Sequence, residues 1–335
     1  MKTVTIVIPT YKRSDYVVRV IENALQQDYT SFDILIIDDN GIGTEHQKKT
    51  CKVLKPLVEK YSNVTYLALP QNLGACKARN MGIQNASGDF IAFLDDDDFW
   101  HPHFLSEMMN IINCRNADIV YSDFYRMDEY GIFYNKNEKK YEGDIHDYLL
   151  QGWCPASTSL FCIKRSVLLK YGCFNETLRN LEEYELWLRL SADYHFYFCD
   201  KKMVVKTEFQ HEQLTNNFDS RIDAWLKMKE LNWVQGLSHF QHKMYQDMID
   251  ANIKSELYHR ELYSSKFNVK VNYLFNTFGI VKVMNIIVSK LIGLRNYNRI
   301  KRFFLKFRGL VKYVSKKECV NIQKTFRISV SNILA

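Results

Sequence analysis

The sequence has 335 residues, of which 47% are hydrophobic and 25% are charged, and its formal net charge is +7. These values are typical of a globular protein and exclude a disordered chain. No apolar stretch is long enough for a transmembrane helix, residues 1–9 lack the features of a secretory signal, and no Cys/His cluster has the spacing of a zinc site.

The charge is unevenly distributed along the chain. Residues 266–335 hold 15 Lys and Arg but one acidic residue, Glu318, which gives this part +14 and leaves −7 on residues 1–265. We therefore expect the two parts to meet different partners. The acidic part needs a metal ion to hold a phosphate, whereas the basic part can meet an anionic surface directly.

The first third of the chain alternates between predicted strands and helices. Strands are predicted at 4–10, 32–39, 63–69, 89–94 and 117–123, and helices at about 14–27, 44–61, 74–87 and 102–114. This alternation indicates right-handed βαβ units and a mainly parallel sheet. Ser14 is the expected cap of the first helix, and Asp98 the expected cap of the helix near 102.

The pattern is looser after residue 124. It predicts a hairpin at 127–134, a strand at 157–163, a helix at 181–192, short strands at 195–199 and 203–209, and mostly helices at 220–335. We therefore expect one α/β domain at residues 1–215 and a mostly helical region at 216–335, basic from about residue 266.

Candidate site residues follow three of the predicted strands. Thr10 and Tyr11 end the first, Asp38 and Asp39 end the second, and the run Asp95 to Asp98 follows the fourth. Ligands of α/β sheets bind beyond the carboxyl ends of the strands, so these side chains should converge on one crevice. A carboxylate cluster there suits Mg²⁺ or Mn²⁺, which binds one or two protein carboxylates and the oxygens of a phosphate. The alternatives are a solvated acidic turn at the four aspartates and a simple Asp-Asp-Asn-Gly turn at 38–41.

Four motifs give the chain a resemblance to a known family: VIPTYKR (7–13), IIDDNG (36–41), the long segment 72–100, and EEYELWLRL (182–190). Over about residues 3–212 the sequence resembles the family 2 glycosyltransferases. The resemblance implies the GT-A fold, a Rossmann-like mainly parallel sheet flanked by helices, here with a helical basic C-terminal extension. It also implies an inverting enzyme that takes a sugar from a nucleotide-activated donor, often UDP-linked, with Mn²⁺ or Mg²⁺ as cofactor.

The resemblance also implies which residues bind the nucleoside. Thr10 and Tyr11 match the strand end beside the base and ribose. Asp39 matches the carboxylate that contacts uracil, and Asp38 lies next to it. These four residues are the expected nucleoside contacts.

Further residues match the part of the family site that holds phosphates and metal. Arg79 matches a position facing the donor phosphates, and its alternative is a surface arginine on a helix. Asp95 and Asp97 match the two acids of the DXD motif, with Asp97 as metal ligand and Asp96 near the ribose. His211 is a further candidate metal ligand, because some family members place a histidine there.

The catalytic base is expected at the start of the 181–192 helix. The family usually supplies the aspartate of a Glu-Asp pair, and here the pair is Glu182-Glu183, so Glu183 is the predicted base. Glu183 shares a helical face with Trp187, which a fully solvated face would not need. The alternative is an acidic first turn favoured by the helix dipole. Residues 153–155 are expected either to shape the acceptor pocket or to pack ordinarily.

The basic tail lies outside the resemblance. Apolar residues form one helical stripe in 279–294, and 295–317 mixes Phe, Leu and Tyr with dense Lys and Arg. This composition is typical of an interfacial helix on anionic lipid, with a helix packed on the first domain as the alternative. We see no nucleic-acid-binding module, so nucleic acid is not an expected partner.

The sequence thus predicts a glycosyltransferase of cell-surface polysaccharide assembly. Its expected partners are a nucleotide-sugar donor, a saccharide or lipid-linked glycan acceptor, and an anionic membrane surface. Its expected location is cytoplasmic, peripheral at the inner face of the cell membrane. The alternative is a noncatalytic membrane-associated scaffold with a decayed nucleotide-sugar site.

Overall fold

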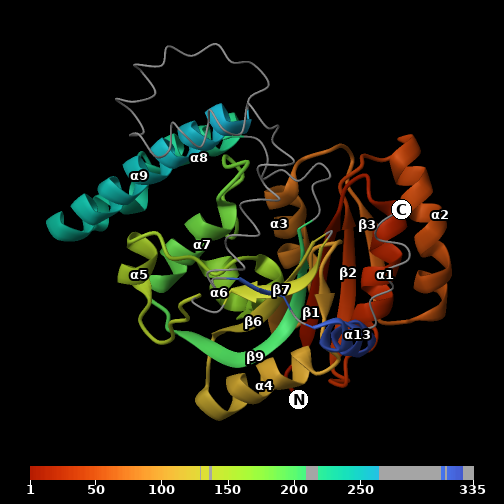
Figure 1. The fold of residues 1–335 in the computed structure, drawn as a ribbon. Helices are drawn as coiled ribbons and strands as arrows, with labels where there is room; N and C mark the ends of the chain where they lie inside the picture. The colour runs from red at the N-terminus through yellow and green to blue at the C-terminus, as the bar shows by residue number, and fades with distance from the viewer. Residues whose placement is uncertain (129, 136–137, 209–217, 264–310, 314, 327–335) are drawn as a thin grey trace.

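The computed structural model describes residues 1–335 except 129, 136–137, 209–217, 264–310, 314 and 327–335. Its centre is a ten-stranded mixed sheet with helices packed on both faces (Figure 1). The strands are β1 (Val4–Thr10), β2 (Phe32–Asp38), β3 (Val64–Ala68), β4 (Phe90–Phe93), β5 (Phe99–Trp100), β6 (Ile119–Asp128), β7 (Gly131–Asn135), β8 (Phe161–Lys164), β9 (Phe196–Thr207) and β10 (Val311–Tyr313).

The helices between β1 and β9 include the five that the sequence predicts, together with α5 and α6, which it does not. They are α1 (Ser14–Ala24), α2 (Glu45–Lys60), α3 (Ala75–Asn85), α4 (Phe104–Arg115), α5 (His146–Leu150), α6 (Arg165–Lys170), α7 (Glu182–Ser191), and the 3₁₀ turn η1 (Thr158–Leu160). The helical elements beyond them are α8 (Phe218–Met228), the 3₁₀ turn η3 (Asn232–Gly236), α9 (His239–Tyr263) and α13 (Lys316–Thr325). The predicted fold class is therefore confirmed.

The parallel strands of the sheet end together at one edge, where the predicted site residues lie. Strand β1 pairs in parallel with β2 on one side and β4 on the other, and Thr10 lies opposite Asp38. The central strands carry Val, Ile and Phe side chains on both faces, which suits strands covered by helices on each side. The carboxyl ends of β1, β2 and β4 therefore open on the same edge, as the sequence predicts.

Helix α3 approaches β1 unusually closely. A Cβ atom on Gly82 would lie 2.3 Å from Cγ1 of Val7, so only glycine allows this contact. The close packing fixes the height of α3 against the sheet, and with it the position of every side chain on this helix.

Four local expectations are corrected. Ser14 is the first residue of α1, and Arg13 takes the cap position. Asp98 does not cap a helix, because α4 begins only at Phe104; its buried Oδ1 instead accepts a hydrogen bond of 3.1 Å from the backbone N–H of Thr207. The two short strands at 195–209 are one long strand, β9, whose pairing with β6 is shifted near Asp123. The strand predicted at 157–163 begins as η1 and becomes β8 only at Phe161.

The end of the described chain packs back on the first domain. Strand β10 pairs antiparallel with β7, and α13 buries Ile322 and Phe326 in a small core that also holds Phe99. The side-chain amide of Asn23 donates to the carbonyl of Phe326 at 3.0 Å. Residues 311–313 are thus a strand, which corrects the interfacial helix expected across 295–317, whereas 264–310, including the stripe at 279–294, lie outside the described residues.

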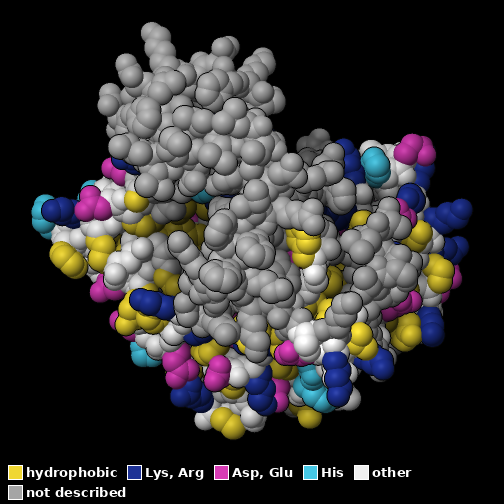
Figure 2. Space-filling view, in the orientation of Figure 1, with side chains coloured by type: hydrophobic (Ala, Val, Ile, Leu, Met, Phe, Trp, Pro, Cys, Tyr) yellow, Lys and Arg dark blue, Asp and Glu magenta, His cyan; other side chains and the backbone are white. Residues whose placement is uncertain are grey.

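The described surface carries mixed charge. Figure 2 shows Lys and Arg side chains along the edge formed by α2, where Lys48 and Lys49 form ion pairs with Glu45 and Asp15. This edge is a solvated charged face. Within the described part of the chain, no helix combines the length and the apolar character that crossing a membrane requires.

Candidate functional site

An arginine and two aspartates meet where β1 and β4 end. Arg13 Nη1 lies 2.8 Å from Oδ1 of Asp96 and 2.6 Å from Oδ2 of Asp97, and the hydroxyl of Thr10 donates to Asp96 at 2.7 Å. Burial and the neighbouring Asp97 raise the pKa of Asp96, and Arg13 opposes this shift. The predicted residues Thr10, Asp96 and Asp97 are thus brought together, and Arg13 joins them.

A second arginine lies on the other side of the aspartate run. Arg79, on α3, forms ion pairs with Asp95 at 2.9 Å and with Glu182 at 3.2 Å, while its guanidinium carbon lies 5.5 Å from the centre of the Phe174 ring. Burial opposes ionisation of Asp95, but Arg79 outweighs it and holds the pKa of Asp95 below its usual range. Arg79 is buried, which removes the alternative of a surface arginine.

Asp39 is held by the loop that leads into α3. Its carboxylate accepts hydrogen bonds from the backbone N–H groups of Leu73 and Gly74, at 2.7 and 2.8 Å, and from the amide of Asn72 at 2.9 Å. Burial nevertheless raises the pKa of Asp39, and these donors oppose the rise. Asp39 therefore links the end of β2 to the start of the helix that carries Arg79.

Asp38 and Tyr11 occupy contrasting environments. Asp38 has no exposed surface, and its carboxylate accepts hydrogen bonds from Asn40 and from the hydroxyl of Tyr66 at 2.6 Å. The oxygens of Asp38 are thus bonded to neighbouring side chains, and its direct contact with a nucleoside stays a prediction. Tyr11 is 41% exposed beside the strand end, with the ammonium of Lys12 4.9 Å from its ring centre.

Glu183 lies in the first turn of α7, beside the Arg79 pair. Burial, together with the neighbouring charge of Glu182, raises the pKa of Glu183 to about 7, against the opposing effect of Arg79. Leu181, the residue before Glu182 and the start of α7, takes a left-handed φ of 64°, which is costly for a branched side chain. Trp187, one turn further, is fully buried on the ring of Phe161.

Residues that the sequence analysis did not assign complete the surroundings of Glu183. Lys206, on β9, donates to the carbonyl of Ala156 at 3.0 Å, and its charge acts on both Asp95 and Glu183. Burial raises the pKa of the Cys154 thiol, and Glu183 adds to that shift, so the 153–156 segment borders the predicted base. A lysine among the buried side chains of β9 is the signal that points to Lys206.

The aspartate run offers carboxylate oxygens for a metal ion. Among the described residues, no three His, Cys, Asp or Glu side chains are grouped to hold a metal ion, and His211 lies outside those residues. Mg²⁺ and Mn²⁺ nonetheless need only one or two protein carboxylates when a substrate supplies phosphate oxygens. The side chain of Asp97 is 24% exposed beside Asp96, which fits such a partial ligand set.

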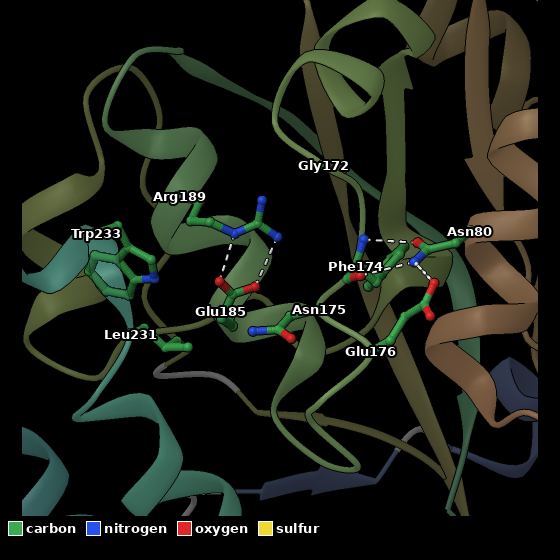
Figure 3. A pocket seen from close by; sticks show the side chains of 9 residues that line it. All are labelled: Asn80, Gly172, Phe174, Asn175, Glu176, Glu185, Arg189, Leu231 and Trp233. Carbon is green, nitrogen blue, oxygen red and sulfur yellow. Dashed lines mark hydrogen bonds and ion pairs between the residues drawn. The ribbon is translucent and has the colours of Figure 1, made fainter.

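A hollow of about 520 Å³ is lined by residues of α3, α7 and the loop at 172–176, together with Leu231 and Trp233 (Figure 3). Its polar groups bind each other: Arg189 forms a two-bond ion pair with Glu185, and Asn80 donates to the carbonyl of Phe174 and to Glu176. Asn80 thus holds the loop at 172–176 to α3, while Arg189 also donates to the carbonyls of Tyr171 and Cys173 and so holds the start of the loop to α7. The bonds around the hollow therefore fix the loop that carries Phe174, whose ring lies against the guanidinium of Arg79.

Comparisons with known proteins agree with this architecture. Residues 5–172 match the family model described as Glycosyl transferase family 2. An uncharacterized glycosyltransferase of Rickettsia typhi is 25% identical over 254 residues, covering 70% of this chain and 76% of its own. WcaA of Escherichia coli K12, named for colanic acid biosynthesis, is 26% identical over 205 residues, covering 57% of this chain and 67% of its own.

Solved structures share the fold at lower sequence identity. Residues 1–349 of Staphylococcus aureus TarS, in complex with UDP-GlcNAc, superpose with a TM-score of 0.60 at 17% identity, covering 89% of this chain and 88% of that one. The mannosyltransferase PcManGT of Pyrobaculum calidifontis, in complex with GDP-Man and Mn²⁺, gives 0.53 at 14% identity, covering 87% of each chain. At these identities the likeness shows the GT-A-type fold alone.

Proposed function

The chain belongs to glycosyltransferase family 2, and we propose that it is an inverting enzyme that transfers a sugar from a UDP-linked donor to a saccharide or lipid-linked glycan. The observation that carries the proposal is the arrangement at the strand ends. Two arginines, Arg13 and Arg79, flank the aspartate run, and Glu183 lies next to Arg79's partner Glu182. This arrangement suits a nucleoside diphosphate bound beside a proton acceptor.

Glu183 is the proposed general base. The acceptor hydroxyl oxygen forms the new bond to the anomeric carbon from the face opposite the nucleotide. Glu183 takes the hydroxyl proton, and the bond to the donor phosphate oxygen breaks with its electron pair. A pKa near 7 suits this role, because about half of the carboxylate is then ionised at neutral pH and the ionised form is basic enough to accept the proton.

The proposed donor site spans the ends of β1, β2 and β4. Thr10 and Tyr11 would lie along the nucleoside, with Asp39 facing the base, although three donors of the 72–74 loop already bind its carboxylate. Asp97, supported by Asp95, would hold Mn²⁺ or Mg²⁺, which when bound neutralises charge on the departing diphosphate. The buried guanidinium of Arg79 adds fixed positive charge there without reorganisation.

The proposed acceptor is a growing surface glycan, and the proposed location is cytoplasmic, at the inner face of the cell membrane. The naming of WcaA for colanic acid biosynthesis supports a polysaccharide pathway, and the +14 charge of residues 266–335 supports an anionic membrane surface as partner. Binding to vesicles that contain anionic lipid, measured for the full chain and for a variant that lacks residues 264–310, would test the membrane surface as a partner directly.

A donor screen tests the central proposal. Purified protein is mixed with Mn²⁺ and a panel of UDP- and GDP-sugars, and donor hydrolysis and transfer are measured. Release of nucleoside diphosphate from one donor supports the enzyme. Calorimetry that detects no UDP binding with Mn²⁺, together with no hydrolysis, would instead favour the noncatalytic scaffold, whose one motivating feature is Glu183 in place of the family's usual aspartate.

A further inference from the structure

We propose that Arg13 is the internal counter-ion of the nucleotide-free donor site. Arg13 competes with the divalent cation for Asp97, and when that cation binds, the guanidinium of Arg13 pairs with the donor diphosphate instead. This inference rests on the proposed donor site and adds a residue that the sequence analysis did not assign. It starts from one contact: the guanidinium of Arg13 bridges the two carboxylates of Asp96 and Asp97 at 2.8 and 2.6 Å.

The position of Arg13 is built into the fold. Lys12 takes a left-handed φ of 57°, a conformation uncommon for a residue other than glycine, and its N–H donates to Oδ1 of Asn40 at 2.8 Å. The Asn40 amide in turn donates to Asp38 at 2.7 Å, and this bond fixes the orientation of the Asn40 side chain. The buried Asp38 thus holds the turn that directs Arg13 at the aspartate run, and this gives Asp38 a positioning role.

The charges explain why a counter-ion is needed. Asp96 and Asp97 are adjacent carboxylates, and their side chains are 7% and 24% exposed. Two such charges repel strongly in a partly buried site, so an empty site needs a cation. Arg13 supplies it, and Asp96 and Asp97 in return raise the pKa of Arg13 above its usual value against the opposing effect of burial.

The two arginines of the site differ in freedom. Arg79 is 7% exposed and lies between Asp95, Glu182 and the ring of Phe174, which fixes it in place. The side chain of Arg13 is 30% exposed, and its ion pairs among the described residues are those with Asp96 and Asp97. A divalent cation that binds an oxygen of Asp97 removes one of the two partners of Arg13. The diphosphate then offers a new pair of acceptors for the planar guanidinium of Arg13.

The proposal predicts opposite effects of one substitution. In Arg13→Gln, Mn²⁺ alone should bind about 5- to 150-fold more tightly than in the wild type, because its competitor is gone. UDP should bind more weakly to the Mn²⁺-saturated variant, because Arg13 no longer reaches the diphosphate. The factor by which UDP strengthens Mn²⁺ binding should therefore fall, and by linkage so should the reciprocal factor.

Free Mn²⁺ is measured by electron paramagnetic resonance at one fixed pH, with and without UDP. Arg13→Lys is the matched control: it retains the charge and should show a smaller gain in Mn²⁺ affinity, and it carries the test if Arg13→Gln does not fold. Unchanged or weaker Mn²⁺ binding in a folded variant would overturn the inference. A wild type that binds neither Mn²⁺ nor UDP would instead overturn the proposed donor site itself.

Discussion

The guanidinium of Arg79 lies 2.9 Å from a carboxylate oxygen of Asp95, and this ion pair joins helix α3 to the loop that follows strand β4. The same guanidinium reaches Glu182 at 3.2 Å, so one buried cation connects the aspartate run to the helix that carries Glu183. Donor-binding and proton-accepting groups are therefore held in one network, and substitutions in it can separate their roles.

Glu183→Gln should reduce kcat about 10²- to 10⁴-fold while leaving UDP affinity within about threefold, because the amide keeps the shape of the side chain but cannot accept the proton. Single-turnover transfer and UDP calorimetry measure the two quantities. Glu185→Gln is a poor control, since Glu185 forms a buried ion pair with Arg189. Glu176→Gln is better suited, because the Glu176 side chain is 43% exposed and the amide can still accept from Asn80. A fully active Glu183→Gln enzyme would exclude Glu183 as the base.

The pH profile of kcat should show an acidic limb near pH 7. The base must be ionised, and burial with the Glu182 charge raises the pKa of Glu183 to about 7, so activity is present above that pH and is lost as the pH falls through it. Glu182→Gln removes the neighbouring negative charge and should move the limb to lower pH. A limb that does not respond to this substitution would assign the titration to another group.

Asp97→Asn should weaken Mn²⁺-dependent UDP binding by roughly 100-fold, since several kcal/mol of metal-mediated attraction to the diphosphate would be lost. Titration calorimetry with UDP, at saturating Mn²⁺ and in chelator, separates the metal-dependent part. Asp33→Asn is the matched control, because Asp33 lies at the other end of β2, where it accepts from Thr5. Equal losses in both variants would indicate a general effect on stability.

Gly82→Ala should destabilise the fold by about 1–3 kcal/mol and weaken UDP binding, because its Cβ would meet Val7 Cγ1 at 2.3 Å and displace α3 with Arg79. Urea unfolding measures the first effect. The double variant Gly82→Ala/Val7→Ala restores the space and should recover part of the UDP affinity. Gly236→Ala, whose Cβ would meet nothing within 4 Å, is the control. Additive losses in the double variant would show that the contact with Val7 is not the cause.

Phe326→Ala should lower the free energy of unfolding by about 3 kcal/mol, because the ring is 2% exposed in the core that contains Phe99. Val320→Ala, in the helix that ends just before Phe326 but 46% exposed, should change it by less than about 0.5 kcal/mol. Denaturant unfolding monitored by circular dichroism compares the two. Similar small effects would mean that α13 adds little to the stability of the sheet.

The ends of β1, β2 and β4 could be predicted because each is an apolar run followed at once by polar residues, a local signal. The joining of Arg13 to Asp96 could not, since 83 positions separate them and only the parallel pairing of β1 with β4 brings them together. Arg13 is the last residue of the VIPTYKR motif, so the motif places it after β1 without indicating its partner.

The wrong predictions at Asp98 and at residues 311–313 have one physical origin, which is that contacts distant in sequence decide both. Asp98 was expected to cap a helix because the sequence shows an aspartate before a helical segment, but its Oδ1 instead accepts from Thr207, 109 positions away. The strand at Val311–Tyr313 follows a long basic segment, and only its pairing with β7 reveals it. Local patterns therefore specified the elements, while contacts distant in sequence decided which polar side chains face one another.

The pairing of β10 with β7 has a consequence for synthesis of the protein. Ribosomes release a chain from its N-terminus, and β7 emerges long before β10 exists. Until then β7 is an open edge whose backbone groups can pair with any strand nearby, and the pocket for Phe326 beside Phe99 is unfilled. The nascent protein thus exposes an edge open to aggregation until β10 and α13 reach the sheet.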